Sequence, residues 1–244
     1  MLLAVFWGFV AGAALVIGAA VGLRFDLAKW VIALVMAFGS GALIAALSFE
    51  LTVEAYGNGG LDALAPGLAA GALLFFAGDW YIDRRGGTHR KRSGGQQSPD
   101  AGLAILFGAI LDGLPESAVI GVGLVEGGKV GAAFVAAVFL SNLPEGLSAA
   151  TGMRKAGHSR RAILGTWIIV AAVSALASGI GYAALGDAPE HLIGVLQALA
   201  AGAILTMLAD TMMPEAFDEG GHRPWVGLLT VLGYALGALL AIWA

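Results

Sequence analysis

The chain is dominated by apolar stretches of about 20 residues, the length that a helix needs to cross the hydrocarbon core of a membrane. Eight such stretches are present, at residues 2–23, 30–56, 61–82, 101–125, 128–152, 161–185, 190–217 and 224–243. Of the 244 residues, 59% are hydrophobic and only 12% are charged. This balance lies outside the range of soluble globular domains. We therefore predict an all-α, polytopic membrane bundle of eight transmembrane helices, forming one domain over residues 1–244.

The residue types restrict both the packing and the chemistry of such a bundle. The 38 glycines are spread through the apolar stretches, where small residues allow helices to approach closely. The chain has no cysteine, so a metal site would have to use oxygen donors or histidines. All four histidines, however, lie in loops or at the ends of the predicted helices: His89, His158, His191 and His222.

The basic residues predict the orientation, because Lys and Arg in short loops remain on the cytoplasmic side. With both termini outside, the cytoplasmic side holds 12 of the 13 basic residues, and only Lys129 lies outside. The segment Asp83–Asp100 contains many of these residues, is rich in glycine and has no apolar period. We expect it to be a flexible cytoplasmic loop in a multi-pass protein of the cell inner membrane or plasma membrane.

An internal repeat links the second and seventh predicted helices. Residues 38–56 align without gaps onto 199–217, and the alignment matches Gly41 with Gly202 and Glu54 with Glu215. Helices five apart must cross the membrane in opposite senses. The pattern predicts a 3+2+3 inverted repeat, in which helices 1–3 correspond to 6–8 and helix 4 to helix 5. Inverted repeats that meet near the midplane are typical of transporters.

Two related motifs place acidic residues inside helices 4 and 5. The first is LDGLPESA at residues 111–118, and the second is LSNLPEGL at residues 140–147. Asp112 and Glu116 are four residues apart and therefore share a helix face. In the second motif Ser141 and Glu145 have the same spacing, and Asn142 follows Ser141. These five side chains are the candidate metal ligands.

Each motif also contains a proline, Pro115 or Pro144, which has no N–H to donate to the preceding turn. The carbonyls of Leu111 and Leu140 are therefore expected to lose their helical partners and to kink the helices. A freed carbonyl is tolerated at this depth only if it is buried or lines a cavity. Together with the adjacent carboxylates, these oxygens predict cation coordination.

Burying these carboxylates inside a membrane has a high free-energy cost. An acidic residue near the centre of a membrane helix costs roughly 3 kcal/mol, and no Lys or Arg lies in the central part of a span to neutralise one. The carboxylates must be protonated, hydrated or paired with a bound cation. A purely structural role as protonated groups at a packing kink is the alternative. Four further acidic residues could line a path to the site or simply be hydrated near helix ends: Glu50, Glu54, Asp210 and Glu215.

These features resemble the ZIP (Zrt/Irt-like) family of divalent metal transporters. The resemblance covers essentially the whole chain and rests on eight helices, a variable loop after helix 3 and paired motifs, LPES at residues 114–117 and LPEG at residues 143–146. The family typically carries His-Asn-x-Pro-Glu-Gly in helix 4 and His-Glu-x-Pro-Glu-Gly in helix 5. By this match Glu116 and Glu145 are the motif glutamates of a metal site midway across the membrane.

The departures from the family pattern concern the substrate. Asp112 and Ser141 stand where the family usually has histidines, and Gly113 and Asn142 stand where it often has Asn and a carboxylate. An all-oxygen donor set suits harder ions such as Mn, Mg or Fe(II). Zinc remains the first expectation by family, and broad or shifted selectivity is the competing hypothesis.

The sequence therefore predicts a secondary transporter, not an enzyme, that moves a divalent metal cation toward the cytoplasm. The metal is the transported substrate, and no cofactor is expected. The expected partners are the metal ion and the lipid bilayer, without nucleic acid, and a homodimer is left open. Two alternatives remain, a membrane-embedded metalloenzyme and a non-transporting metal-sensing homologue.

Overall fold

The computed structural model describes residues 1–98, 100–125, 131–185, 188–218 and 223–243, so Lys129 lies outside the described residues. Within these ranges the chain is helical and contains no strand. The α-helices are α1 (Leu2–Arg24), α2 (Lys29–Ala46), α3 (Thr52–Ile82), α4 (Gly102–Gly123), α5 (Ala132–Lys155), α6 (Arg160–Leu185), α7 (Glu190–Met207), α8 (Met213–Asp218) and α9 (Arg223–Trp243). Three π-helical segments continue α2, α3 and α7: η1 (Leu47–Leu51), η2 (Asp83–Gly87) and η3 (Leu208–Met212). The prediction of an all-α membrane bundle is confirmed.

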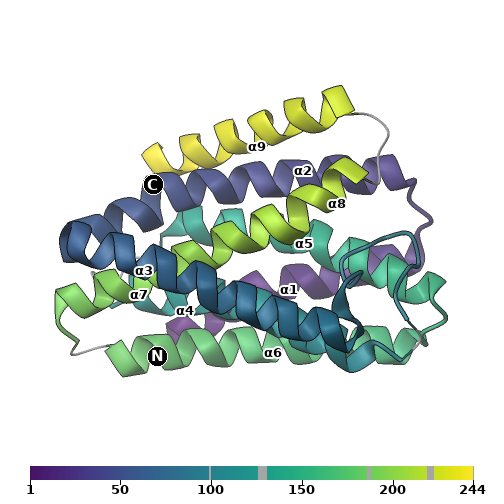
Figure 1. Cartoon of the computed structure of the whole chain (residues 1–244), viewed down its shortest axis with the longest axis horizontal. Helices are drawn as coiled ribbons and strands as arrows, with labels where there is room; N and C mark the ends of the chain where they lie inside the picture. The colour runs from purple at the N-terminus through teal and green to yellow at the C-terminus, as the bar shows by residue number, and fades with distance from the viewer. Residues whose placement is uncertain (99, 126–130, 186–187, 219–222, 244) are drawn as a thin grey trace.

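Seven helices of the described chain are long and apolar enough to span a membrane, where the sequence predicted eight. The difference arises in residues 29–87, where α2, η1, α3 and η2 follow one another with no loop between them and count as one helix. Within this run Gly60 has a φ of 64° and a ψ of −165°, so the backbone is not helical there. Figure 1 shows that α2 and the part of α3 after this turn run in opposite directions.

The helices form two groups, each held together by its own contacts. In one group α1 packs on α5 and α6, and α6 also packs on α4. In the other group α2 packs on α9, and α3 packs on α7. Figure 1 shows α9 and α2 along one edge of the bundle and α6 along the opposite edge. Contacts between the groups are made mainly by α2 with α5 and by α4 with α7.

The two segments that align in the sequence have matching local structure. The π-helical turn η1 begins at Leu47 and η3 begins at Leu208, which are aligned residues. The aligned glycines also make equivalent contacts. A Cβ at Gly41 would collide with the Thr230 carbonyl of α9, and a Cβ at Gly202 would collide with the Leu68 carbonyl of α3. Glycine at these two positions allows each helix to touch the backbone of its neighbour.

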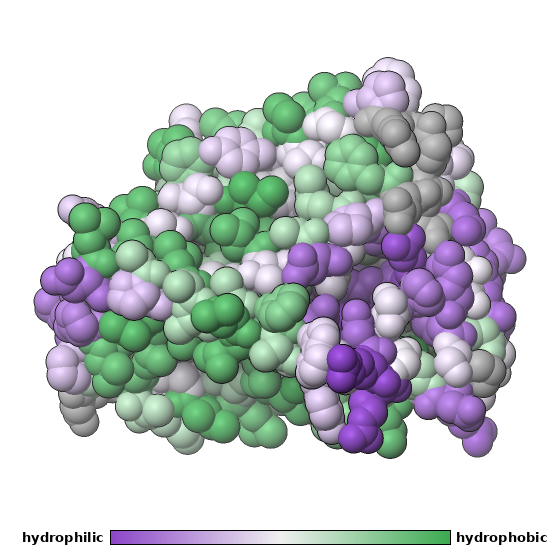
Figure 2. All heavy atoms as spheres, in the orientation of Figure 1, coloured by the Kyte–Doolittle hydropathy of each residue, from purple (hydrophilic) through white to green (hydrophobic). Residues whose placement is uncertain are grey.

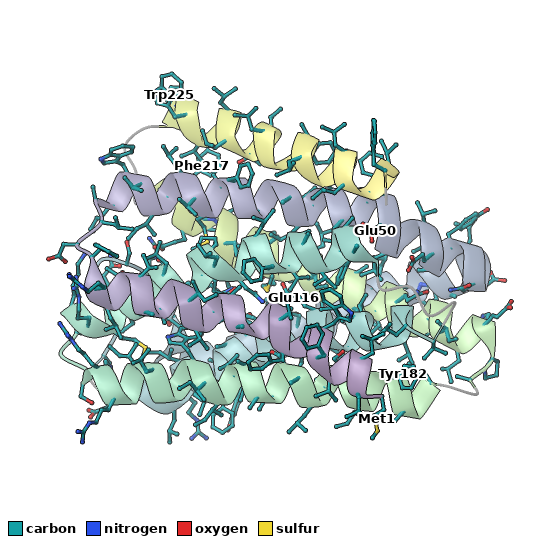
Figure 3. All side chains as sticks on the ribbon, turned by 180° about the vertical axis from the view of Figure 1, so that it is seen from behind. Met1, Glu50, Glu116, Tyr182, Phe217 and Trp225 are labelled. Atoms are coloured by element: carbon teal, nitrogen blue, oxygen red, sulfur yellow. The ribbon has the colours of Figure 1, made fainter. Side chains whose placement is uncertain are left out.

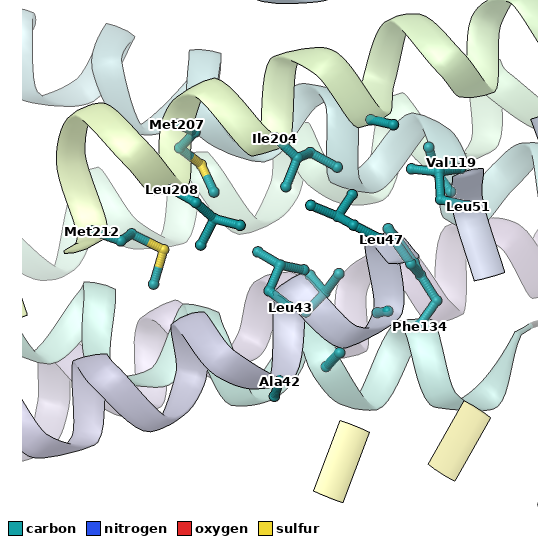
Figure 4. Packing of buried hydrophobic residues seen from close by; sticks show 14 of the residues in the cluster. Ala42, Leu43, Leu47, Leu51, Val119, Phe134, Ile204, Met207, Leu208 and Met212 are labelled. Atoms are coloured by element: carbon teal, nitrogen blue, oxygen red, sulfur yellow. The ribbon is translucent and has the colours of Figure 1, made fainter. Parts of the chain in front are cut away.

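An apolar cluster fills the space between the two aligned segments. Figure 4 shows Leu43 and Leu47 facing Ile204 and Leu208 across this space. All four side chains are at most 5% exposed. Val119 of α4 and Phe134 of α5 belong to the same cluster, so it joins the two helix groups.

The surface divides into an apolar band and two polar ends. Figure 2 shows hydrophobic side chains over the middle of the visible face and hydrophilic ones gathered at the end where residues 83–98, which we call the linker, lie. We name this the linker end, and the opposite end, which carries both termini in Figure 1, the terminal end. Such a band is the surface expected of a protein that contacts lipid around its middle.

Candidate functional site

Three of the predicted site carboxylates are buried in the group formed by α1, α4, α5 and α6. Asp112 and Glu116 project from α4 and Glu145 from α5, and their exposed fractions are 2%, 1% and 3%. Both helices remain helical through their prolines. Figure 3 shows Glu116 near the middle of the bundle, with Met1 at the terminal end and Phe217 toward the linker end. Glu116 of the first motif therefore lies near the middle of the bundle.

Two cations from the linker pair with Asp112 and Glu145. The Lys91 ammonium lies 3.2 Å from Asp112 Oδ2 and 3.3 Å from Glu145 Oε2, so it bridges α4 and α5. The Arg90 guanidinium lies 3.3 Å from Asp112 Oδ1. Both basic side chains are 5% exposed. This pairing was not predicted, because the cations come from a polar segment that was expected to be a flexible loop.

Arg90 also joins two acidic residues of α3 and η2 that the sequence analysis missed. Its Nη2 lies 2.5 Å from Asp79 Oδ1, and its Nη1 lies 3.5 Å from Asp83 Oδ1. Asp79 and Asp83 are spaced four apart, the signal that could have identified them. They line a polar cavity of about 60 Å³ with Asp210 and Glu215. This volume has room for about two water molecules.

Glu215 of α8 also contacts the linker, at Ser93 and Arg92. Its Oε1 accepts a hydrogen bond from the Ser93 backbone N–H at 3.0 Å and lies 3.1 Å from the Ser148 hydroxyl oxygen. The Arg92 Nε lies 3.4 Å from Glu215 Oε2. Glu215 is 2% exposed, so a residue that was predicted either to line a path or to be hydrated near a helix end is enclosed by the linker.

The linker cations are charged at neutral pH. Burial lowers the pKa of the Lys91 amine, but the Asp112 and Glu145 carboxylates raise it by more, and the pKa lies above its ordinary value. Burial likewise lowers the pKa of Arg90, and the Asp112 and Asp79 carboxylates outweigh this effect, so that it too lies above its ordinary value. The site therefore holds two full positive charges against its carboxylates.

The remaining predicted ligands face other partners. The Ser141 hydroxyl donates to the Val138 carbonyl of its own helix, and the Asn142 amide donates to the Ala11 carbonyl of α1. Glu116 Oε1 has no hydrogen-bond partner among the described residues. No group of three or more carboxylate or imidazole side chains in the described chain is arranged to hold one ion. In this conformation Lys91 occupies the space where Asp112 and Glu145 approach each other.

Glu50 and Glu54 lie toward the terminal end, as Figure 3 shows for Glu50. They line a small cavity of about 30 Å³, together with Val119, Ile120 and Phe134. Glu54 Oε2 accepts a hydrogen bond from the Gln197 amide at 3.1 Å. Because Val119 and Ile120 follow Glu116 by about one helical turn, apolar side chains separate this cavity from the central carboxylates.

Asp112 of one acidic motif and Glu145 of the other are thus joined inside the bundle by ion pairs to the linker. A family model described as ZIP zinc transporter matches residues 82–243, about two thirds of the chain. The chain belongs to the ZIP family. No curated protein matches it. The matched region contains α4 to α9 and therefore both motifs, and membership of ZIP confirms metal transport in a membrane as the broad role.

ZIP proteins are transporters, and in this member the described histidines lie away from the two acidic motifs. His89 and His191 are exposed, His158 lies in the turn between α5 and α6, and His222 lies outside the described residues. A catalytic zinc site normally places histidines beside a glutamate. The alternative of a membrane-embedded metalloenzyme therefore gains no support from the described histidines.

Proposed function

We propose that this ZIP protein carries a divalent metal cation into the cytoplasm through a site formed by Asp112, Glu116 and Glu145. The observation that carries the proposal is the position of the Lys91 ammonium, 3.2 Å from Asp112 and 3.3 Å from Glu145. Two helices that hold a buried cation between carboxylates provide the charge and the oxygen donors that a divalent metal needs. Ser141 and Asn142 assist by turning their oxygens toward the ion when it replaces the ammonium.

The proposed topology has eight spans, with both termini outside. Residues 29–87 would extend about 88 Å as one straight helix, nearly three times the thickness of the hydrocarbon core. The turn at Gly60 divides this run into two spans. An even number of spans agrees with the position of both termini at the same end of Figure 1. The basic linker end would then face the cytoplasm, as Lys and Arg in short loops do.

Alternating access is supported by the arrangement of cavities at the two ends. The cavity at Glu50 and the cavity at Asp79 lie on opposite sides of the central carboxylates. The matching π-helical turns η1 and η3 and the equivalent contacts of Gly41 and Gly202 support a 3+2+3 inverted repeat. Two related halves can then rock around the site between them.

The test is metal uptake into liposomes that contain the purified protein. We expect Glu116→Ala and Glu145→Ala to abolish the uptake of zinc and manganese, because each removes an anionic ligand at mid-depth. Glu190→Ala is the control, since Glu190 is exposed in the first turn of α7. Uptake that persists unchanged in both site variants, or no uptake by the wild-type protein, would contradict the proposal.

A further inference from the structure

The linker is held in the bundle by hydrogen bonds to its backbone as well as by the ion pairs of its side chains. The Lys91 carbonyl accepts a hydrogen bond from the Ser148 hydroxyl at 2.5 Å, and the Ser93 carbonyl accepts one from the Lys155 ammonium at 2.9 Å. The Gln97 amide donates to the Arg92 carbonyl at 2.8 Å. Ser93 is fully buried. These contacts fix residues 90–97 in one position over the carboxylates.

Two glycines of the site helices make room for the linker. A Cβ at Gly108 of α4 would collide with the Arg90 side chain, and a Cβ at Gly152 of α5 would collide with the Arg92 carbonyl. The obstacle at Gly152 is backbone, which cannot move aside as the end of a side chain can. The surfaces of α4 and α5 are therefore shaped to receive this segment beside their carboxylates.

The charges of the linker match those of the proposed substrate. Lys91 lies between Asp112 and Glu145. Arg90 contacts Asp112 and also the carboxylates of Asp79 and Asp83. Together the two basic side chains carry the same charge as one divalent ion. An unpaired carboxylate at this depth is costly. The exchange of these two side-chain cations for one divalent ion therefore leaves the charge of the site unchanged.

We propose that Lys91, assisted by Arg90, is the resident counter-cation of the carboxylate site. This inference rests on the proposed function. The linker leaves Asp112 and Glu145 when a divalent ion binds and returns when the ion departs toward the cytoplasm. Lys91 is thus a competitor for the site that lowers its apparent affinity for metal and keeps the empty carboxylates neutralised.

The first test is metal affinity, measured by calorimetry with zinc and with manganese on the purified protein. Lys91→Gln removes the competing charge, so we expect metal to bind about tenfold more tightly, as it would if the linker occupied the site in about nine-tenths of metal-free molecules. Arg85→Gln is the matched control, because Arg85 is exposed and lies over the Tyr81 ring. Its affinity should equal that of the wild type.

Gly152→Ala is a second variant, which retains every charge. The added methyl group displaces the linker, so it should also tighten metal binding, whereas Gly165→Ala, in open space on α6, should not. If the wild type binds metal and neither Lys91→Gln nor Gly152→Ala binds it more tightly, the inference is overturned and the proposed function stands. If no variant binds or transports metal, the proposed function fails, and the inference fails with it.

The second test follows the linker directly. Because the chain has no cysteine, Ser93→Cys introduces a unique thiol at a fully buried position of the linker. We expect slow maleimide labelling without metal and at least about tenfold faster labelling with saturating manganese. Ser98→Cys, at an exposed position of the same segment, should react rapidly in both conditions. Equal rates for Ser93→Cys with and without bound manganese would overturn the exchange.

Discussion

Glu54 and Glu215 occupy equivalent positions in two aligned segments, and each follows the last residue of a π-helical turn by three residues. Their partners nevertheless differ. Glu54 accepts a hydrogen bond from Gln197 of α7, whereas Glu215 accepts one from the Ser93 backbone of the linker. The same position in the repeat is therefore exposed at the terminal end and covered at the linker end.

This difference predicts that neutralising the two glutamates affects two different steps, metal entry for Glu54 and the position of the linker for Glu215. Glu54→Gln should raise the KM for external metal several-fold with little change in the maximal rate, because it removes a negative charge that attracts cations to the outer cavity. Glu215→Gln should instead speed maleimide labelling of a cysteine at Ser93, because it removes the charge that holds Arg92. Liposome uptake and labelling measure the two effects. Identical phenotypes for both variants would contradict this assignment.

The burial of Glu116 predicts that a substitution there abolishes metal uptake without lowering the unfolding temperature. Its carboxyl is 1% exposed, and its Oε1 has no hydrogen-bond partner among the described residues. Glu116→Gln replaces a buried ionisable group by a neutral amide of similar shape, so the metal-free protein should unfold at the same or a higher temperature while metal uptake is lost. Thermal unfolding in detergent and liposome uptake test this. A markedly lower unfolding temperature would indicate a structural role instead.

The departures from the family histidines predict a change in metal preference. Asp112→His with Ser141→His introduces two imidazole ligands, which suit zinc better than manganese or magnesium. We expect competitive uptake among Zn, Mn, Fe, Co, Cd and Mg to shift toward zinc. Asp112→Asn with Ser141→Ala removes the same side chains without adding nitrogen ligands, and it should lower all fluxes together. An unchanged order of preference in the histidine variant would exclude these positions as selectivity determinants.

The close contact of α7 with α3 at Gly202 predicts that a side chain at this position destabilises the protein. Gly202→Ala forces a methyl group against the Leu68 carbonyl and should destabilise the protein by about 1–3 kcal/mol. Gly227→Ala is its control on α9, where nothing lies within 4 Å of the added Cβ, and alanine should there be neutral or stabilising by up to about 1 kcal/mol. Thermal unfolding of both variants in one detergent gives the comparison.

The apolar stretches, the paired Pro-Glu motifs and the shared glycines of the repeat determined the membrane bundle, the family and the depth of the acidic residues. These properties depend on spacing along single helices, which a sequence displays directly. The pairing of Lys91 with Asp112 and Glu145 depended instead on the path of a loop, because hydrophobic periodicity does not report where a polar segment folds back. The tertiary structure alone decided that the charges which neutralise the buried carboxylates come from the linker.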